Sequence, residues 1–253
     1  MEPLSEQNPL LKKIRRAAAH GGLTDDGCAI AEGIHLVEEA IAAGCEVKVI
    51  LITTPDRRFP EAKLLSEKSF RSIAGTETPQ GILALVKPRQ SSTDAILRGQ
   101  AALAVVLDGI QDPGNAGSIL RAAEAFGATG AVFLKGSVNP FNPKCIRASA
   151  GSIFRLPVIQ ADDLTAFEGM TLYAAMPRAE KSADQADFVK PCAVVIGSEG
   201  RGVRESVAAR AAAVRIPTSN VESLNAAVAA GVLFYEARRQ RDAAHASEKK
   251  AAR

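Results

Sequence analysis

Residues 102–126 read ALAVVLDGIQDPGNAGSILRAAEAF, and this stretch sets the fold class. Its first six residues, 102–107, form a continuous apolar run, which is typical of a strand buried on both faces of a parallel sheet. The polar turn DGIQDPGN follows, and the residues from about Ala116 to Phe126 predict a helix that ends at Gly127. Strand, turn and helix in this order indicate an α/β domain with a mostly parallel sheet.

The same alternation continues to the end of this half of the chain. Short apolar runs predict strands at 131–134, 157–160, 172–176, 193–197 and 214–217. Between the first two of these strands, residues 135–155 hold a proline-rich loop and a helix. A strongly apolar helix over 223–240 closes the domain.

The first part of the chain predicts a smaller α/β unit, with helices at 8–19, 34–43 and 61–68 and strands at 28–33, 47–53 and 82–87. The composition then changes, because residues 88–99 mix Pro, Gln and Ser with little periodicity. We therefore predict a first domain over 1–90, a linker over 91–100, a second domain over 101–240, and a basic, disordered tail over 241–253.

The overall composition is that of a globular protein, with 47% hydrophobic and 23% charged residues in a chain of 253. No apolar run approaches the ~20 residues that a membrane span needs. The first residues, MEPLSEQNPLLKK, lack the apolar core of a secretory signal. We therefore expect a cytoplasmic protein.

The four cysteines and three histidines are scattered along the chain, with no C-x-x-C pair and no histidine cluster. This pattern predicts reduced, mostly buried thiols and neither a disulfide scaffold nor a metal site. The shortage of histidine also argues against a Ser-His-Asp or Cys-His hydrolase.

The net charge of +3 is small, but the basic residues are clustered. KKIRR at Lys12–Arg16 and the segment from Arg238 onward are locally strongly basic. Clustered Lys and Arg are typical either of a solvated surface or of a surface that neutralises nucleic-acid phosphates. Composition alone does not choose between the two.

Three polar, mostly glycine-bearing loops follow the carboxyl ends of predicted strands, at 108–121, 197–202 and 217–225. In open α/β sheets, ligands bind outside the carboxyl ends of the strands. Three such loops in one domain predict a shared binding pocket.

The middle loop, GSEGRG at 197–202, invites comparison with dinucleotide-binding turns. Its glycines give G-x-x-G-x-G, the reverse of the Rossmann spacing, and Glu199 would place a negative charge among phosphate-binding amides. A cationic or hydroxyl-bearing ligand suits Glu199 better. The alternative is a tight turn with a surface glutamate.

The other two loops place asparagines at helix starts. Asp112 or Asn115 is expected to cap the first helix, and Ser223 is a candidate cap for the last one. Capping does not account for Asn225, which the predicted helix places two residues inside an apolar segment. A buried amide needs polar partners, so we interpret Asn225 as a site residue.

Together these loops resemble the three motifs of the SpoU, or TrmH-like, family of RNA 2′-O-ribose methyltransferases. NAGSILRAAEAFGA resembles the first motif, VVIGSEGRGV the second, and RIPTSNVESLNAAVAAGVLFYEARR the third; RASAGSIFRLPV also fits the pattern. The front part, with AEGIHLVEEAIAAG and TETPQGILALV, is similar to the family's ribosomal-protein-like substrate-binding domain. The resemblance implies a trefoil-knot (SPOUT) fold, S-adenosylmethionine as cofactor and a homodimer, for which the helix over 223–235 is a candidate interface.

The resemblance also implies residue roles. The catalytic set would be Asn115, Arg121, Glu199, Ser223 and Asn225. The cofactor would be held by Gly197, Ser198, Gly200, Ile216, Pro217, Thr218 and Leu224, and no metal would be required. The RNA would be contacted by Lys12, Lys13, Arg15, Arg16, Lys144, Arg147 and Arg155. Within the catalytic set Arg121 suits phosphate binding better than proton abstraction, because a guanidinium is a poor base.

In one respect the sequence departs from the family. Thr218 stands where the third motif often has Met, and the loop lacks a glycine, which affects the expected contact with the cofactor's adenine. The expected substrate is large-subunit rRNA rather than tRNA. Two other functions remain open: a non-catalytic RNA-binding ribosome assembly factor and, disfavoured by the glycine spacing, a nucleotide-dependent oxidoreductase.

Overall fold

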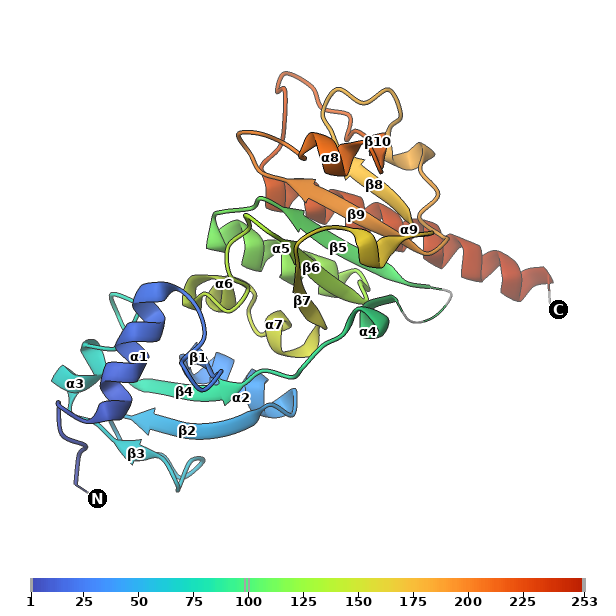
Figure 1. The fold of residues 1–253 in the computed structure, drawn as a ribbon. Helices are drawn as coiled ribbons and strands as arrows, with labels where there is room; N and C mark the ends of the chain where they lie inside the picture. Colours follow the sequence, from blue (N-terminus) through green and yellow to red (C-terminus); the bar gives the residue numbers. More distant parts are fainter. Residues whose placement is uncertain (1, 98, 100, 252–253) are drawn as a thin grey trace. The chain divides into compact units, whose positions relative to one another are not determined.

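The computed structural model describes residues 2–97, 99 and 101–251, which form two compact units (Figure 1). Unit 1 comprises Met1–Gln90 and Asn139–Arg155, and unit 2 comprises Ser91–Val138 and Leu156–Arg253. Residues 139–155 therefore group with unit 1, whereas the sequence analysis assigned them to the second domain. None of the described helices is both long and apolar enough to cross a membrane.

Unit 1 is built on a four-stranded sheet in the order β1-β4-β2-β3. The strands are β1 (Ala29–Glu32), β2 (Glu46–Ile52), β3 (Lys63–Leu64) and β4 (Ile82–Lys87); β4 is antiparallel to both β1 and β2. The helices are α1 (Pro9–His20), α2 (Ile34–Ala42), α3 (Glu67–Arg71), α6 (Pro143–Ala148) and α7 (Ser152–Arg155). Leu11 and Ile14 of α1 pack on β4 and Phe70 in one apolar core.

The prediction of a helix near 61–68 is wrong. The structure has the short strand β3 there, followed by α3, whose N-cap is Ser66. The Ser66 hydroxyl accepts a hydrogen bond from the Ser69 amide at 3.2 Å, and capping of this kind starts a helix at the next residue. Leu65 and Phe70 are both buried, so the chain enters the core on either side of the cap.

A buried ion pair joins α6 to the rest of unit 1. The Glu32 side chain is 3% exposed and lies 3.4 Å from the Arg147 guanidinium. It also accepts hydrogen bonds from the Gly75 amide at 2.8 Å and the Thr76 hydroxyl at 2.6 Å. A buried carboxylate needs partners of this kind. This pairing gives α6 a structural role in unit 1.

Unit 2 contains a six-stranded sheet in the order β10-β8-β9-β5-β6-β7, with every neighbouring pair parallel. Its strands are β5 (Leu103–Asp108), β6 (Gly130–Leu134), β7 (Val158–Ala161), β8 (Thr171–Ala175), β9 (Cys192–Gly197) and β10 (Ala212–Val214). Each residue of β5 is buried, as expected for a central parallel strand. The predicted α/β class with a mostly parallel sheet is confirmed, although the last strand ends three residues earlier than predicted.

The helices of unit 2 are α4 (Thr93–Leu97), α5 (Pro113–Ala125), α8 (Glu205–Ala208) and α9 (Ala226–Ala251), with 3₁₀ turns at Thr165–Phe167 and Ala183–Gln185. Helices α5 and α9 pack against each other: Gly231 faces Ala122, and the rings of Phe126 and Tyr235 meet edge to face at 5.7 Å. This packing brings the starts of the two helices to the same edge of the sheet.

The prediction of a disordered tail is wrong for residues 241–251, because α9 continues to Ala251. The Arg241 guanidinium donates to backbone carbonyls of Ala101, Ala102, Phe188 and Lys190, which fastens the helix to unit 2. Residues 252–253 lie outside the described residues. The predicted linker is also partly helix: α4 buries Ile96 in the core of unit 2, while positions 98 and 100 lie outside the described residues.

Candidate functional site

Three side chains from three loops meet in unit 2. Glu199 Oε1 accepts hydrogen bonds from the side-chain amides of Asn115 at 2.8 Å and Asn225 at 2.7 Å. The Asn225 amide also donates to Asn115 Oδ1 at 3.1 Å. These residues are 26 to 110 positions apart in sequence, so only the fold unites them. We refer to Asn115, Glu199 and Asn225 as the amide–carboxylate cluster.

Each asparagine is fixed at the start of a helix. Asp112 is the N-cap of α5, and its carboxylate accepts from the Asn115 backbone amide at 2.7 Å. Helix α9 begins at Ala226, and Asn225 Oδ1 accepts from the backbone amides of Ala227 at 2.9 Å and Val228 at 3.3 Å. Asn225 therefore caps α9 with its oxygen while its nitrogen binds the cluster.

This geometry corrects the sequence interpretation of the last helix. Ser223 was a candidate N-cap, and Asn225 was placed inside the helix; instead Asn225 is the cap and is exposed. The apolar segment of the sequence begins at Leu224, two residues before α9 begins, because the Leu224 side chain lines a cavity and is not part of the helix. Ser223 lines the same cavity.

Glu199 keeps one oxygen uncommitted. Both amides of the cluster bind Oε1, and among the described residues none donates a hydrogen bond to Oε2. A carboxylate has about four acceptor positions, so Glu199 retains acceptor capacity toward a ligand. This capacity fits the sequence expectation of a hydroxyl-bearing ligand.

The loop that carries Glu199 is held tightly at its base. A Cβ added to Gly197 would lie 2.2 Å from the carbonyl carbon of Gly202, so a larger residue has no space there. Ser198 and Gly202 exchange backbone hydrogen bonds of 3.1 and 2.8 Å across the turn. Close backbone packing therefore accounts for the glycine at position 197.

Asp108 ties this loop to the end of β5, and the sequence analysis did not select it. Its carboxylate is fully buried and accepts from the Arg204 backbone amide at 2.7 Å and from Arg204 Nε at 2.5 Å. In the sequence, Asp108 could have been found as the acidic residue that directly follows the six-residue apolar run 102–107. Asp108 and Arg204 therefore set the distance between the loops that hold Asn115 and Glu199.

A first cavity of about 310 Å³ opens beside the cluster. Five of the seven residues predicted to hold the cofactor line it: Gly197, Ser198, Ile216, Thr218 and Leu224. Gly200 lines a neighbouring cavity instead, and Pro217 lines neither. The cavity is also lined by Ala175, Met176 and Pro177, which no sequence motif marks, since the adjacency of β8 and β9 cannot be inferred from local pattern.

The donor set of this cavity fits an adenosyl cofactor. Its lining is mostly apolar side chains and loop backbone, with polar groups at the edge from Glu222, Ser223 and Asn225. Cavities of this kind, from about 300 Å³ upward, bind small molecules. Gly197, Ile216 and Leu224 belong to this lining. Glu199 adds negative charge to it, whereas the Glu222 carboxylate pairs with Arg178.

Arg121 lies apart from these cavities. It is exposed on α5, lines neither cavity, and makes no hydrogen bond or ion pair with the described residues. Six residues along a helix correspond to a rise of about 9 Å and a rotation of about 600°, which is one full turn plus about 240°. Arg121 and Asn115 therefore occupy different faces of α5. Its catalytic role stays a prediction.

Most of the basic residues expected to contact RNA already have partners in unit 1. Lys13 pairs with Asp26 at 2.5 Å and Arg16 with Asp25 at 3.2 Å, while Arg15 binds Ser72 and the Glu6 carbonyl. Arg155 pairs with Glu39, and Arg147 pairs with the buried Glu32. Lys12 and Lys144 are exposed and form no ion pair with the described part of the chain.

The described residues contain no group of three His, Cys, Asp or Glu side chains suited to a metal ion. All four cysteines are buried. Burial raises the pKa of the Cys145 thiol to about 12 and that of Cys192 to about 11. Both thiols are therefore protonated at neutral pH and poor nucleophiles.

Comparison with known proteins gives consistent results. A model described as the SpoU rRNA Methylase family matches residues 102–235, and an MRM3-like substrate binding domain matches 8–84. The chain is 36% identical over 263 residues to an uncharacterized tRNA/rRNA methyltransferase of Synechocystis, covering 95% of this chain and 94% of that one. It is 30% identical over 249 residues to the 23S rRNA (guanosine(2553)-2′-O)-methyltransferase RlmP of Bacillus subtilis, covering 92% and 98%. The crystal structure of the SpoU methyltransferase AviRb from Streptomyces viridochromogenes with AdoMet superposes with a TM-score of 0.83, at 25% identity over 93% of this chain and 98% of that chain.

Proposed function

The chain belongs to the SpoU family of S-adenosylmethionine-dependent tRNA/rRNA 2′-O-methyltransferases, and we propose that its own substrate is a ribose 2′-hydroxyl in large-subunit rRNA. Membership confirms the SPOUT fold class, the enzyme class and the cofactor expected from the sequence. The choice of rRNA is supported by the relative from B. subtilis, whose name gives 23S rRNA as substrate and whose length this chain covers almost fully. The cytoplasmic location stays a prediction.

The observation that carries the catalytic proposal is the amide–carboxylate cluster at the edge of the first cavity. S-adenosylmethionine, when bound, supplies an electrophilic methyl group. The residues of the first cavity would hold it, with Gly197 and Leu224 providing backbone contacts and Ile216 an apolar wall. Asn115 and Asn225 fix Glu199 at the point where a ribose hydroxyl must approach.

Glu199 Oε2 is the acceptor that this arrangement offers to the 2′-hydroxyl. Because Oε1 already binds two amides, Oε2 is directed by them rather than free to rotate. S-adenosylmethionine held in the first cavity would supply the methyl group, and Glu199 Oε2 would accept the hydroxyl proton as the 2′-oxygen is methylated. Positioning of this kind reduces the entropic cost of bringing the reactants into line.

Arg121 keeps the role predicted from the sequence, which is to bind a phosphate next to the target ribose. Its guanidinium has no partner among the described residues and is available to RNA. We expect Arg121→Ala to abolish methylation while leaving S-adenosylmethionine binding nearly intact. Single-turnover kinetics and calorimetry measure the two effects separately, and lost cofactor binding with normal turnover at saturation would contradict the assignment.

We assign RNA binding to unit 1, which the substrate binding domain model matches. Of the predicted RNA contacts, Lys12 and Lys144 form no ion pair with the described residues, so they can bind a phosphate without breaking one. The pairs of Lys13 and Arg16 are on the surface, where such pairs contribute at most about 1 kcal/mol, so phosphates can replace Asp26 and Asp25. Arg147 is the least available of the predicted contacts, since moving it would remove the cation that pairs with the buried Glu32.

A homodimer is also proposed, and the apolar surface of α9 supports it. Val228, Val232 and Tyr235 lie three and four residues apart, so they share one helix face, and all three are exposed. An exposed apolar stripe of this kind is typical of a protein interface. Sedimentation of wild type and Val232→Glu should give a dimer and a monomer, respectively; a monomeric wild type would contradict the proposal.

The experiment that tests the substrate is a map of ribose methylation in total RNA from cells with and without the gene. Loss of one methylation in large-subunit rRNA is the expected result, whereas a lost tRNA methylation would assign the enzyme to tRNA. Calorimetry with S-adenosylmethionine accompanies it, because a protein that binds RNA but not the cofactor would be a non-catalytic assembly factor.

A further inference from the structure

A second cavity, of about 600 Å³, also borders Glu199. Ser198, Glu199 and Gly202 line both cavities, while Asn225 lines only the first and Asn115 only the second. The amide–carboxylate cluster therefore borders both cavities, and Glu199 is accessible from each.

The walls of the second cavity are fixed by hydrogen bonds. The Gly109 amide donates to the Ser137 hydroxyl at 2.9 Å, and that hydroxyl donates to the Leu107 carbonyl at 2.9 Å. The Val138 amide donates to the Ile110 carbonyl at 2.8 Å. With the Asp108–Arg204 pair, these bonds join the loops after β5, β6 and β9, so the cavity is formed before any ligand binds.

The charges of this cavity divide into committed and uncommitted groups. Arg204 is paired with the buried Asp108, and Asp112 caps α5. In contrast, the side chains of Lys135 and Arg201 make no hydrogen bond or ion pair with the described residues. Beside the carboxylates of Asp112 and Glu199, the cavity thus presents two cations without a partner among the described residues, and these suit an anionic group of a ligand.

The spacing of these groups matches a nucleotide. Lys135 follows β6 and Glu199 follows β9, and β5 lies between these strands. Two strand spacings amount to about 10 Å. A ribose beside Glu199 and a phosphate beside Lys135 fit within that distance.

We propose that the second cavity receives the target nucleotide, with its ribose against the amide–carboxylate cluster and an adjacent phosphate bound by Lys135 and Arg201. This proposal rests on the proposed function, since it identifies how the RNA substrate meets the same cluster. It assigns to Lys135 and Arg201 a substrate-binding role that the motifs did not indicate.

The test compares Lys135→Ala, Arg201→Ala and the double variant with the wild type, on an unmodified transcript of the rRNA identified by methylation mapping. Lys190→Ala is the matched control, because it also removes one exposed lysine of unit 2, which pairs with Asp187 away from both cavities. Each site variant should raise KM for RNA about tenfold, the value of one charge-assisted hydrogen bond. The salt dependence of RNA binding should also become shallower, by about 0.7–0.9 in slope for each phosphate that the variant no longer binds.

Calorimetry with S-adenosylmethionine separates this proposal from the proposed function. Unchanged cofactor affinity together with raised KM supports the second cavity as the nucleotide site. Unchanged KM and salt slope in the double variant, with an active wild type, would overturn the cavity assignment alone, as would a parallel loss of cofactor affinity. A wild type that binds no cofactor and methylates no RNA would instead overturn the proposed function.

Discussion

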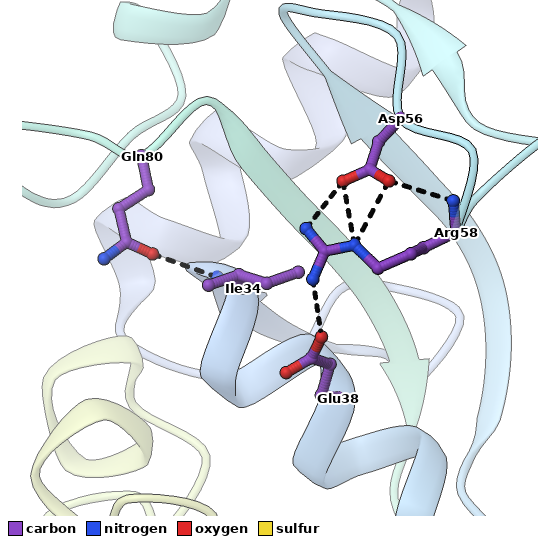
Figure 2. A network of polar contacts seen from close by, with 5 residues as sticks. All are labelled: Ile34, Glu38, Asp56, Arg58 and Gln80. Atoms are coloured by element: carbon purple, nitrogen blue, oxygen red, sulfur yellow. Dashed lines mark hydrogen bonds and ion pairs between the residues drawn. The ribbon is translucent and has the colours of Figure 1, made fainter.

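Units 1 and 2 each place an exposed polar cluster beside a cavity, and the two clusters differ in how they are built. In unit 1, the Arg58 guanidinium binds both oxygens of Asp56 and one oxygen of Glu38, while Gln80 Oε1 accepts from the Ile34 amide (Figure 2). All of these residues except Glu38 border a cavity of about 340 Å³. In unit 2, the amide–carboxylate cluster borders two cavities.

The difference lies in what each cluster leaves available. Asp56 and Arg58 are two residues apart, and the Arg58 cation is shared by two carboxylates, so its positive charge is already neutralised within the cluster. The cluster in unit 2 joins distant loops and keeps Glu199 Oε2 unused by the described residues, with the free cations Lys135 and Arg201 nearby. Because the Arg58 guanidinium is already paired within its own cluster, we infer a structural role for that cluster. Because Glu199 Oε2 still has acceptor capacity, we infer a functional role for the amide–carboxylate cluster.

Among variants of the two clusters, the largest effect is expected at Asn225, where the capping and site functions can be separated. Asn225→Asp keeps an oxygen to cap α9 but sets a carboxylate against Glu199. We expect about a 100-fold loss of methylation rate, comparable with losing one preorganised catalytic hydrogen bond. Thermal unfolding should change little, because Asp is an equally good N-cap.

Asn225→Ser is the matching variant, since it also caps but does not reach Glu199. If both variants methylate at the wild-type rate, Asn225 acts only as a helix cap, and the amide–carboxylate cluster would then be structural, like the Arg58 cluster of unit 1.

An intermediate effect is expected from Asp108→Ala, which removes the buried partner of Arg204 without touching the cluster. Two hydrogen bonds to a carboxylate are lost, which should cost about 2–3 kcal/mol of unfolding free energy. Chemical denaturation measures this change. Methylation should fall as well, because the loops carrying Asn115 and Glu199 lose their tie; full activity in the folded variant would show that the loops are positioned by other contacts.

A smaller effect is expected from Arg58→Ala in unit 1. Its ion pairs are exposed, so their loss should lower the unfolding free energy by no more than about 1 kcal/mol. The methylation rate at saturating RNA should equal that of the wild type, as measured in the same assay as Asn225→Asp. A large drop in this rate would assign a catalytic function to the unit 1 cluster.

The smallest effect concerns acid stability of unit 1. The hydrogen bond from Lys13 lowers the pKa of Asp26 to about 2, from an ordinary value of 3.8. Because the folded pKa is depressed, this carboxylate stabilises the fold above about pH 4, and the contribution is lost as pH falls through about 2. With 51% of the Asp26 side chain exposed, solvent screening limits it to less than about 1 kcal/mol.

Urea unfolding of wild type and Asp26→Asn at pH 6 and pH 2 checks this expectation. The two proteins should differ at pH 6 and converge at pH 2, and a difference that grows at low pH would reverse the assigned sign.

Several features of the fold were readable from local pattern. The buried run before Asp108 and the glycine-bearing turn after β9 gave strands and turns within a few residues of their observed bounds, because burial on both faces leaves a continuous apolar signature. Errors occurred where tertiary contacts override local pattern. Residues 241–251 have a composition typical of a disordered tail, yet Arg241 fastens this part of α9 through backbone carbonyls that no sequence motif marks.

The site shows the same division. By themselves, the motifs determined the family and the cofactor through their resemblance to the SpoU family, and the same resemblance predicted Asn115, Glu199 and Asn225 as site residues. Only the tertiary structure decided that Glu199 Oε1 is saturated while Oε2 is open, that Arg147 is committed to Glu32, and that Lys135 borders the site. The reason is physical: hydrogen-bond partners and free charges are set by distances between loops far apart in the chain, and local sequence carries no information about those distances.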